Sequence, residues 1–181
     1  MGSEADAEQV VAAARRGDQG AWEQLLGSLY PRLRAYTARR LPPPYVEDAV
    51  SETMTRAVAG IDRFRWGPAG FDGWVFGIGR NVVADHYRSV SKDADRADRM
   101  VGPDLSELPG DAVDLGEDHA QVRRCFALLN DKEQELLGLR VIAGLSAEQV
   151  AAVLGKRPGA VRSAQSRALS RLRELMESDD A

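Results

Sequence analysis

The sequence predicts an all-α protein made of two small helical domains joined by an acidic linker. Aromatic residues make up only 6% of the 181 residues, whereas Ala, Leu, Arg and Val are common, a composition that favours helices over sheets. Apolar residues recur at spacings of three and four along most of the chain, the period of a helix with one buried face. The net charge of −4 is unevenly spread, because residues 93–118 carry nine acidic and two basic side chains and the remainder of the chain is net basic.

The acidic segment marks the boundary between the two domains. The stretch from Asp93 to Asp118 also contains Pro103, Pro109 and three glycines. A charged stretch of this composition repels itself and stays extended. We therefore predict one domain over residues 6–90, a flexible linker over residues 91–119 and a second domain over residues 120–177.

Three helical segments begin the first domain. The first ends at Gly17, a residue type that is common just after a helix. The second covers residues 21–30, with apolar residues at helical spacing. We expect Pro31 to begin a third helix over residues 31–41, because proline fits the first turn of a helix better than its interior. Three consecutive prolines at 42–44 end that helix.

Two longer helices complete the first domain. Residues 45–61 carry an apolar stripe on one face and charged residues on the other. Residues 71–90 form the next helix, in which Gly77 and Gly79 are each about 1 kcal/mol less favourable than Ala; close packing against another helix would explain them. The stripe of residues 45–61 consists of Val46, Val50, Met54 or Thr53, Ala57 and Ile61, and that of residues 71–90 consists of Trp74, Ile78, Val82 and Tyr87.

The second domain carries clear local signals for the start and end of its first long helix. Asn130 and Asp131 are good caps, and Glu133 and Gln134 lie three residues after them, a spacing typical of a capping box. The apolar pattern then continues to Gly144, where we expect the helix to stop.

A short helix, a tight turn and a longer helix follow. Ser146 with Gln149 repeats the capping box, Gly155 ends the short helix, and Pro158 suits the first position of the last one. We expect the last helix to turn Val161, Ala168, Leu172 and Leu175 inward and Arg162, Ser163, Ser166, Arg167, Ser170 and Arg173 outward.

The outer face of the last helix is basic. Residues 156–173 carry six basic side chains and no acidic one, whereas solvated helices usually pair bases with acids at i,i+4. A short helix, a tight turn and a longer helix with a basic, hydroxyl-rich face predict a helix-turn-helix whose counter-charge is the phosphate of a nucleic acid.

Three stretches in this order resemble the RNA polymerase sigma factors of the sigma-70 family, specifically the small two-domain extracytoplasmic-function (ECF) group. Residues 46–64, "VEDAVSETMTRAVAGIDRF", are similar to region 2.2. Residues 71–88, "FDGWVFGIGRNVVADHYR", are similar to regions 2.3–2.4, and residues 129–175 to region 4. The resemblance implies a protein that binds core RNA polymerase and directs promoter-specific transcription initiation by recognising the −35 and −10 DNA elements.

The resemblance also implies roles for residues of the first domain. Asp48, Glu52 and Arg56, each four residues apart, would present one polar face to polymerase; the alternative is an ordinary solvated face. Trp74 is assigned to the core, and Tyr87 remains open between core packing and base stacking. The residues implied for binding the −10 element are Phe64, Arg65, Arg80, Asn81, His86, Tyr87 and Arg88.

For the −35 element the resemblance implies Arg162, Ser163, Ser166 and Arg167, which match the recognition-helix positions. The chain departs from the family where Lys156 and Arg157 replace an apolar residue and Ser, where Ala164 replaces a frequent Arg, and where Gln165 replaces an apolar residue. Gln165 could itself read adenine. The complete set for the −35 element is Lys156, Arg157, Arg162, Ser163, Gln165, Ser166, Arg167 and Arg171.

The composition also indicates where the protein acts and which partners it binds. A single cysteine, Cys125, excludes an intramolecular disulfide and is expected to be buried packing. No apolar run reaches the ~18–20 residues of a membrane span, and the acidic N-terminus does not resemble a signal peptide, so we expect a cytoplasmic protein without membrane insertion.

The resemblance implies core RNA polymerase, promoter DNA and an anti-sigma factor as partners, with no cofactor and no metal. The acidic linker is either a nucleic-acid mimic that becomes ordered on polymerase or a plain spacer.

Two other functions are weighed against this one. Glu47, Asp48 and Glu52 could bind a divalent metal in a helical enzyme, but no second acidic cluster accompanies them, and one Cys with two His does not make a zinc site. We therefore do not expect an enzyme. A stand-alone repressor or activator needs only the helix-turn-helix, and the polymerase-docking pattern of the first domain distinguishes the two.

Overall fold

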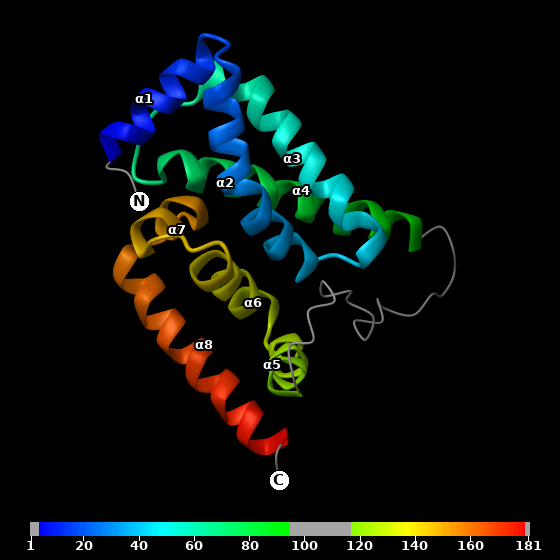
Figure 1. Ribbon diagram of the computed structural model, residues 1–181. Coiled ribbons are helices and arrows are strands. Elements are labelled where there is room, and N and C mark those ends of the chain that lie inside the picture. Colours follow the sequence, from blue (N-terminus) through cyan, green and yellow to red (C-terminus); the bar gives the residue numbers. More distant parts are fainter. Residues whose placement is uncertain (1–3, 95–116, 180–181) are drawn as a thin grey trace.

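The computed structural model describes residues 4–94 and 117–179, and within these residues it contains eight α-helices and no strand (Figure 1). The predicted all-α class is confirmed. The first half contains α1 (Glu4–Arg15), α2 (Gln19–Ala38), α3 (Val46–Gly60) and α4 (Gly70–Ala94), with short 3₁₀ turns at Pro43–Tyr45 and Ile61–Arg63. The second half contains α5 (Glu117–Ala127), α6 (Asp131–Leu137), a π-helical turn (Gly138–Ile142), α7 (Ala147–Leu154) and α8 (Pro158–Asp179).

Helix α2 corrects one prediction. Pro31 does not begin a new helix but lies inside a single helix of 20 residues. A proline in a helix interior loses one backbone hydrogen bond and crowds the preceding turn, at a cost of about 3 kcal/mol. Leu29 and Leu33, on either side of it, are both fully buried, and burying two leucines contributes about 3–6 kcal/mol. Tertiary packing therefore outweighs the local preference for a break.

The two glycines within α4 have different explanations. A Cβ on Gly79 would lie 3.0 Å from Cδ1 of Leu33 in α2 and 3.4 Å from Cγ2 of Thr53 in α3, so close helix packing explains this glycine as expected. A Cβ on Gly77 would meet nothing within 4 Å, so the same explanation is wrong for Gly77. Thr53, and not Met54, occupies the fully buried position of the α3 stripe.

The predicted helix ends of the second half are confirmed. The Asn130–Glu133 and Ser146–Gln149 capping boxes are both formed, with both of their hydrogen bonds present. Gly155 ends α7 in the left-handed region at φ 63°, where a residue without Cβ is favoured. The π-helical turn that follows α6 was not predicted.

The two halves pack against each other. Helix α7 lies against α4, and the π-helical turn lies against α2 (Figure 1). A single cluster of buried side chains contains residues of both halves, from Val11 in α1 to Val161 in α8. Cys125 is buried, as expected. Most of the predicted linker over residues 91–119 lies outside the described residues, and the predicted domain limits remain predictions.

Candidate nucleic-acid interfaces

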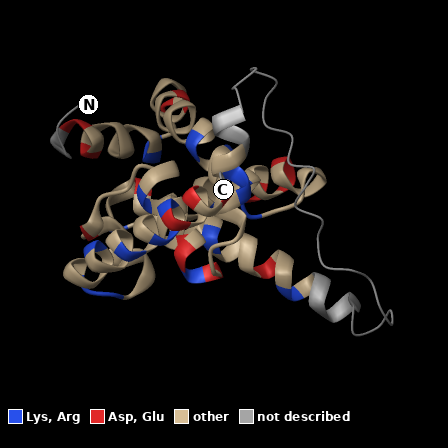
Figure 2. Ribbon diagram, turned by 90° about the horizontal axis from the view of Figure 1, so that it is seen from below, with Lys and Arg blue, Asp and Glu red and all other residues tan. Residues whose placement is uncertain are grey.

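Helices α7 and α8 present the predicted basic face. Of the predicted inward residues of α8, Val161 and Ala168 are fully buried and Leu172 and Leu175 are half-buried, whereas the predicted outward residues of α8 are all exposed. Lys156 and Arg157 lie in the turn between the two helices and are exposed as well. Figure 2 views the molecule from the end at which the C-terminus lies and shows basic and acidic segments close together on this half.

Acidic residues outside 156–173 neutralise two of the six basic side chains in that stretch. Arg162 Nη2 forms an ion pair with Oε1 of Glu148 in α7, and Arg171 Nη1 lies 3.7 Å from Oε2 of Glu174. Backbone hydrogen bonding at the helix start and the charge of Arg162 lower the pKa of the Glu148 carboxyl. The other four bases have no ion-pair partner within the described parts of the chain: Lys156, Arg157, Arg167 and Arg173.

Gln165 is placed differently from the prediction. Its Oε1 accepts a hydrogen bond of 2.8 Å from Nε of Arg140, whose Nη1 also donates to the carbonyl oxygen of Leu145. The amide is half-buried between α8 and the π-helical turn. In this arrangement the Gln165 side chain links α8 to the π-helical turn through Arg140.

A second surface lies on α4 and the loop before it. Arg65, Arg80 and Asn81 line one cavity of about 420 Å³, together with Gly77 and Trp74. The far wall of the cavity is formed by Ala152 and Val153 of α7. The structure therefore brings four of the predicted −10 residues together, because Phe64 also lines this cavity, but around a space that the second half of the chain partly covers.

The structure corrects the prediction that Phe64 binds the −10 element. Its ring is 2% exposed and packs edge-on against Trp66 and Phe71, at centroid distances of 5.1 and 5.4 Å, and at 5.1 Å from Trp74. A ring held on three sides by other aromatic residues is unavailable for stacking on a base. Phe64 is part of the core that supports the loop, and Trp74 packs against the same core as expected.

The remaining predicted residues of α4 lie further along the helix. His86 packs against Tyr45 with the rings tilted by 52° at a centroid distance of 4.3 Å. Tyr87 is 39% exposed, and its hydroxyl donates to the carbonyl oxygen of Arg40. Partial burial raises the pKa of Tyr87. Arg88 Nη2 pairs with Oδ1 of Asp85 at 2.9 Å.

Sequence reasoning missed two arginines near this surface, Arg39 and Arg40 at the end of α2. They line a second cavity, of about 560 Å³, together with Arg80, Tyr87 and Glu135. The Arg39 guanidinium lies 5.8 Å from the centroid of the Phe126 ring, and burial lowers its pKa. In the sequence, only the two consecutive basic residues at the end of the helix before the three prolines could have indicated this position.

The predicted polymerase-binding residues lie on one exposed face of α3. Asp48, Glu52 and Arg56 are all exposed. Arg56 Nε lies 2.7 Å from Oε1 of Glu52, and its Nη1 lies 3.5 Å from Oδ2 of Asp85. Their geometry is suited to recognition of a complementary charged surface.

Glu47 does not join this face as a metal ligand. Its carboxylate accepts hydrogen bonds of 2.8 Å from Arg34 Nε and 2.9 Å from the Tyr30 hydroxyl, which lower its pKa. In the part of the chain that is described, no group of three or more His, Cys, Asp or Glu side chains could hold a metal ion. Nor does any described helix combine the length and the apolar character that crossing a bilayer requires.

An all-helical chain with a helix-turn-helix and a second basic surface is typical of a nucleic-acid-binding protein. Comparison with known proteins identifies the family. Residues 25–92 match the model of sigma-70 region 2, and residues 125–174 match that of sigma-70 region 4. The chain belongs to the ECF group of RNA polymerase sigma factors of the sigma-70 family, which act in promoter-specific transcription initiation.

Individual relatives are similar over almost the whole chain. The ECF RNA polymerase sigma factor ShbA of Streptomyces griseus is 36% identical over 93% of this chain and 94% of its own length. The ECF RNA polymerase sigma factor SigD of Mycobacterium tuberculosis is 31% identical over 91% of this chain and 81% of its own length.

Two solved structures have a similar fold. The sigma factor RpoE of Bartonella quintana, in complex with the anti-sigma factor NepR, superposes with a TM-score of 0.74 at 27% identity, covering 87% of this chain and 97% of that one. CnrH in complex with the cytosolic domain of CnrY gives a TM-score of 0.64 at 26% identity, covering 94% of this chain and 96% of that one.

Proposed function

We propose that this protein binds core RNA polymerase and brings it to promoters through two DNA contacts, one made by α8 and one by α4. The observation that carries the proposal is the pairing, in one chain, of an exposed basic helix in a helix-turn-helix with a separate surface where Arg65, Arg80 and Asn81 converge. A single-module repressor would need only the first of these surfaces.

For the −35 element, α8 enters the major groove. Arg162, Ser163, Ser166 and Arg167 are exposed on one face of that helix and supply the base and phosphate contacts. Lys156, Arg157 and Arg171 flank that face and bind phosphate. Gln165 acts as a positioning residue through its hydrogen bond with Arg140.

For the −10 element, Arg65, Arg80 and Asn81 contact the strand that is captured unpaired. Arg80 and Arg65 bind phosphate, and Asn81 reads a base edge. His86, Tyr87 and Arg88 extend the same contact along α4 toward the upstream duplex, where Tyr87 offers a partly exposed ring for stacking.

Asp48, Glu52 and Arg56 form the contact with polymerase, supported by their exposure on one face of α3. Binding and strand capture involve no covalent step, so the role is not enzymatic. The protein acts in the cytoplasm, where polymerase and promoter DNA are found. An anti-sigma factor is a further proposed partner, because the RpoE structure similar to this chain is a complex with one.

The test is run-off transcription with purified core polymerase on a library of genomic fragments, followed by sequencing of the transcript starts. Core polymerase with the protein should start at a small set of sites that share two elements separated by a fixed spacing. Core alone, or the protein alone, should give no such set. Starts that are identical with and without the protein would refute the proposal.

A further inference from the structure

The loop between α3 and α4 (residues 61–69, here the α3–α4 loop) begins with the 3₁₀ turn Ile61–Arg63 and carries Arg65, one of the proposed −10 contacts. Arg65 is exposed, and its Nη1 donates to the carbonyl oxygens of Asp62 at 2.7 Å and of Phe64 at 2.8 Å. The position of the Arg65 guanidinium therefore depends on the direction in which these two carbonyl groups point.

A second arginine, at the end of α1, holds the same loop. Arg15 donates from Nε to the carbonyl oxygen of Ile61 at 3.1 Å and from Nη2 to that of Phe64. Its Cζ also lies 5.7 Å from the centroid of the Phe64 ring, which is within the range of a cation–π contact. Because the donors of a guanidinium have fixed directions in one plane, this single side chain sets the direction of two backbone carbonyl groups.

The two arginines share one acceptor, the carbonyl oxygen of Phe64. Arg15 and Arg65 both donate to it, so a movement of this carbonyl group moves the guanidinium of Arg65. The carbonyl oxygen of Ile61 is shared as well, because it accepts from the N–H of Phe64 at 3.1 Å and from Arg15. The half-buried Arg15 thus holds the carbonyl groups at both ends of the turn that leads to Arg65.

Local structure and packing fix the backbone from which Arg15 extends. Arg15 is the last residue of α1, and Gly17 follows it with φ 85°, in the left-handed region that favours glycine. Asp18 then begins α2, where its side chain accepts from the N–H of Ala21 at 2.8 Å. On the other side of Arg15, Val11 of α1 belongs to the same buried cluster as the aromatic residues of the α3–α4 loop. The end of α1 is therefore anchored both locally and against the core.

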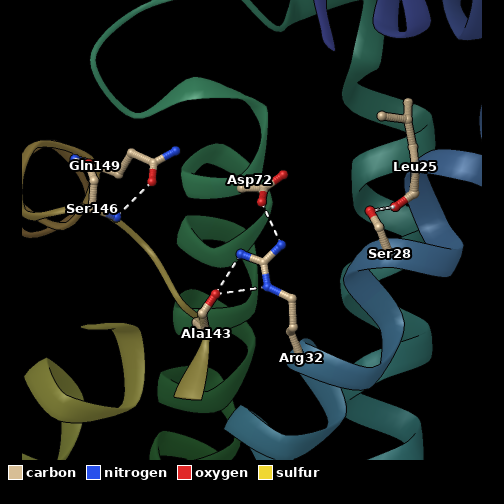
Figure 3. A network of polar contacts seen from close by, with 7 residues as sticks. All are labelled: Leu25, Ser28, Arg32, Asp72, Ala143, Ser146 and Gln149. Carbon is tan, nitrogen blue, oxygen red and sulfur yellow. Dashed lines mark hydrogen bonds and ion pairs between the residues drawn. The ribbon is translucent and has the colours of Figure 1, made fainter. Parts of the chain in front are cut away.

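Another arginine of the chain holds a carbonyl group in a similar way (Figure 3). Arg32 of α2 donates from Nε at 2.8 Å and from Nη2 to the carbonyl oxygen of Ala143, and its Nη1 lies 2.6 Å from Oδ2 of Asp72. Ala143 follows the π-helical turn and is not part of the α3–α4 loop. Arg32 is therefore a matched comparison for Arg15, with the same kind of backbone contact at a different place.

We propose that Arg15 is a positioning residue for capture of the −10 strand: by holding the carbonyl groups of Ile61 and Phe64, it places Arg65 where that side chain contacts a phosphate. The proposal rests on the proposed function of Arg65. Arg15 acts through the α3–α4 loop and makes no DNA contact of its own, because its donors are directed at protein carbonyl groups. Helix α1, which lies before the residues 25–92 that match sigma-70 region 2, thereby contributes to −10 recognition.

The test uses the protein reconstituted with saturating core polymerase. The probe is a labelled single-stranded oligonucleotide that carries the −10 element of a promoter mapped by run-off transcription. Arg15→Gln should weaken probe binding about tenfold and leave affinity for −35 duplex within about twofold. Arg15→Lys should not restore probe binding, because an ammonium group lacks the planar arrangement of donors. Arg16→Gln, the same charge change at an exposed neighbour, and Arg32→Gln are the controls, and each should stay within about twofold.

A double-mutant cycle separates positioning from a direct phosphate contact. Arg65→Ala alone should weaken probe binding about tenfold, and adding Arg15→Gln should cause less than about a twofold further loss, because the side chain that Arg15 positions is then absent. The slope of log affinity against log salt should fall by about 0.7 in each single variant and no further in the double variant. A second fall of the slope in the double variant would show that Arg15 itself binds phosphate, which would overturn the inference.

Amide hydrogen exchange gives a measurement that does not depend on DNA. The N–H of Phe64 donates to the carbonyl oxygen that Arg15 holds, so it should exchange about tenfold faster in Arg15→Gln than in Arg32→Gln. Equal exchange rates, or equal losses of probe binding in these two variants, would overturn the inference. If the proposed function fails instead, Arg65→Ala will bind the probe like the parental protein, and the exchange rate of Phe64 will still show whether Arg15 fixes the loop.

Discussion

Arg162 on the exposed face of α8 is paired with Glu148 of α7, the helix that precedes it in the helix-turn-helix. Both side chains are more than half exposed, at 60% and 52%, and an exposed pair of this kind is worth about 0–1 kcal/mol. We therefore propose that the pair matters for recognition. In this proposal Glu148 holds the arginine in the free protein and competes with DNA phosphate for it.

We predict that Glu148→Gln strengthens binding to −35 duplex. Removing the carboxylate frees Arg162 and also removes a negative charge close to the DNA backbone, so affinity should rise by about two- to fivefold. Fluorescence anisotropy with a labelled duplex measures the effect. Glu177→Gln, an exposed substitution near the far end of α8, is the control and should change affinity little. Weaker binding by Glu148→Gln would mean that the carboxylate contributes a direct DNA contact.

The basic face of α8 predicts a specific salt dependence. Arg167→Ala should lower the slope of log affinity against log salt by roughly 0.9 if the side chain binds a phosphate, or reduce affinity by about 1–3 kcal/mol if it reads a base. Arg162→Ala should behave in the same way. Arg124→Ala is the control, because Arg124 lies on α5 and pairs with Asp179 at 2.9 Å. Unchanged slope and affinity in both variants would show that the face is only solvated surface.

We predict that a charge reversal on the exposed face of α3 weakens polymerase binding and leaves DNA binding unchanged. Asp48→Lys reverses one charge in the row Asp48, Glu52 and Arg56 and should weaken binding to core polymerase about tenfold, because a like charge would then oppose the partner. Affinity for isolated −35 duplex should not change. Glu23→Lys on the exposed side of α2 makes the same charge change elsewhere, and equal effects of the two substitutions on core binding would refute the assignment.

The two glycines of α4 predict opposite changes in stability. Gly79→Ala should lower the free energy of unfolding by about 1–2 kcal/mol, because its Cβ would press on Leu33 and Thr53, both fully buried. Gly77→Ala should raise it by about 0.5–1 kcal/mol, because open space surrounds that position and alanine favours the helix. Denaturant titration of both variants provides the measurement. Equal effects would show that packing against α2 and α3 does not explain Gly79.

Tyr36 predicts a loss of stability at high pH. Burial raises its pKa from 10.0 to about 12, so the folded state retains a phenolic proton that the unfolded state releases. The contribution to stability is fully present below pH 10 and is lost as the pH rises toward 12. Burial also raises the pKa of Tyr87, so ultraviolet titration should show Tyr36 as the last of the four tyrosines to ionise, and Tyr36→Phe should abolish that last step. A titration unchanged by Tyr36→Phe would contradict the assignment.

Local chemistry alone determined the helix ends of the second half. Asn130, Ser146, Gly155 and Pro158 each act through bonds or steric limits within a few residues, so their effects are visible in the sequence before any fold is known. The period of apolar residues likewise determined the all-α class and the outward face of α8. Those predictions required no knowledge of what lies opposite each helix.

Only the tertiary structure decided the remaining features, because they depend on what each residue meets across the fold. Pro31 stays within α2 because its buried neighbours hold the helix together. Phe64 is enclosed by aromatic rings from α4 and the preceding loop, and Gln165 is held by Arg140 from the π-helical turn. Arg80 has the residue type and the helix position expected of a DNA contact, yet in the structure its partner is Glu135, 55 residues away in the sequence. No periodicity or local motif encodes such a pairing, since it exists only when the second half packs on the first.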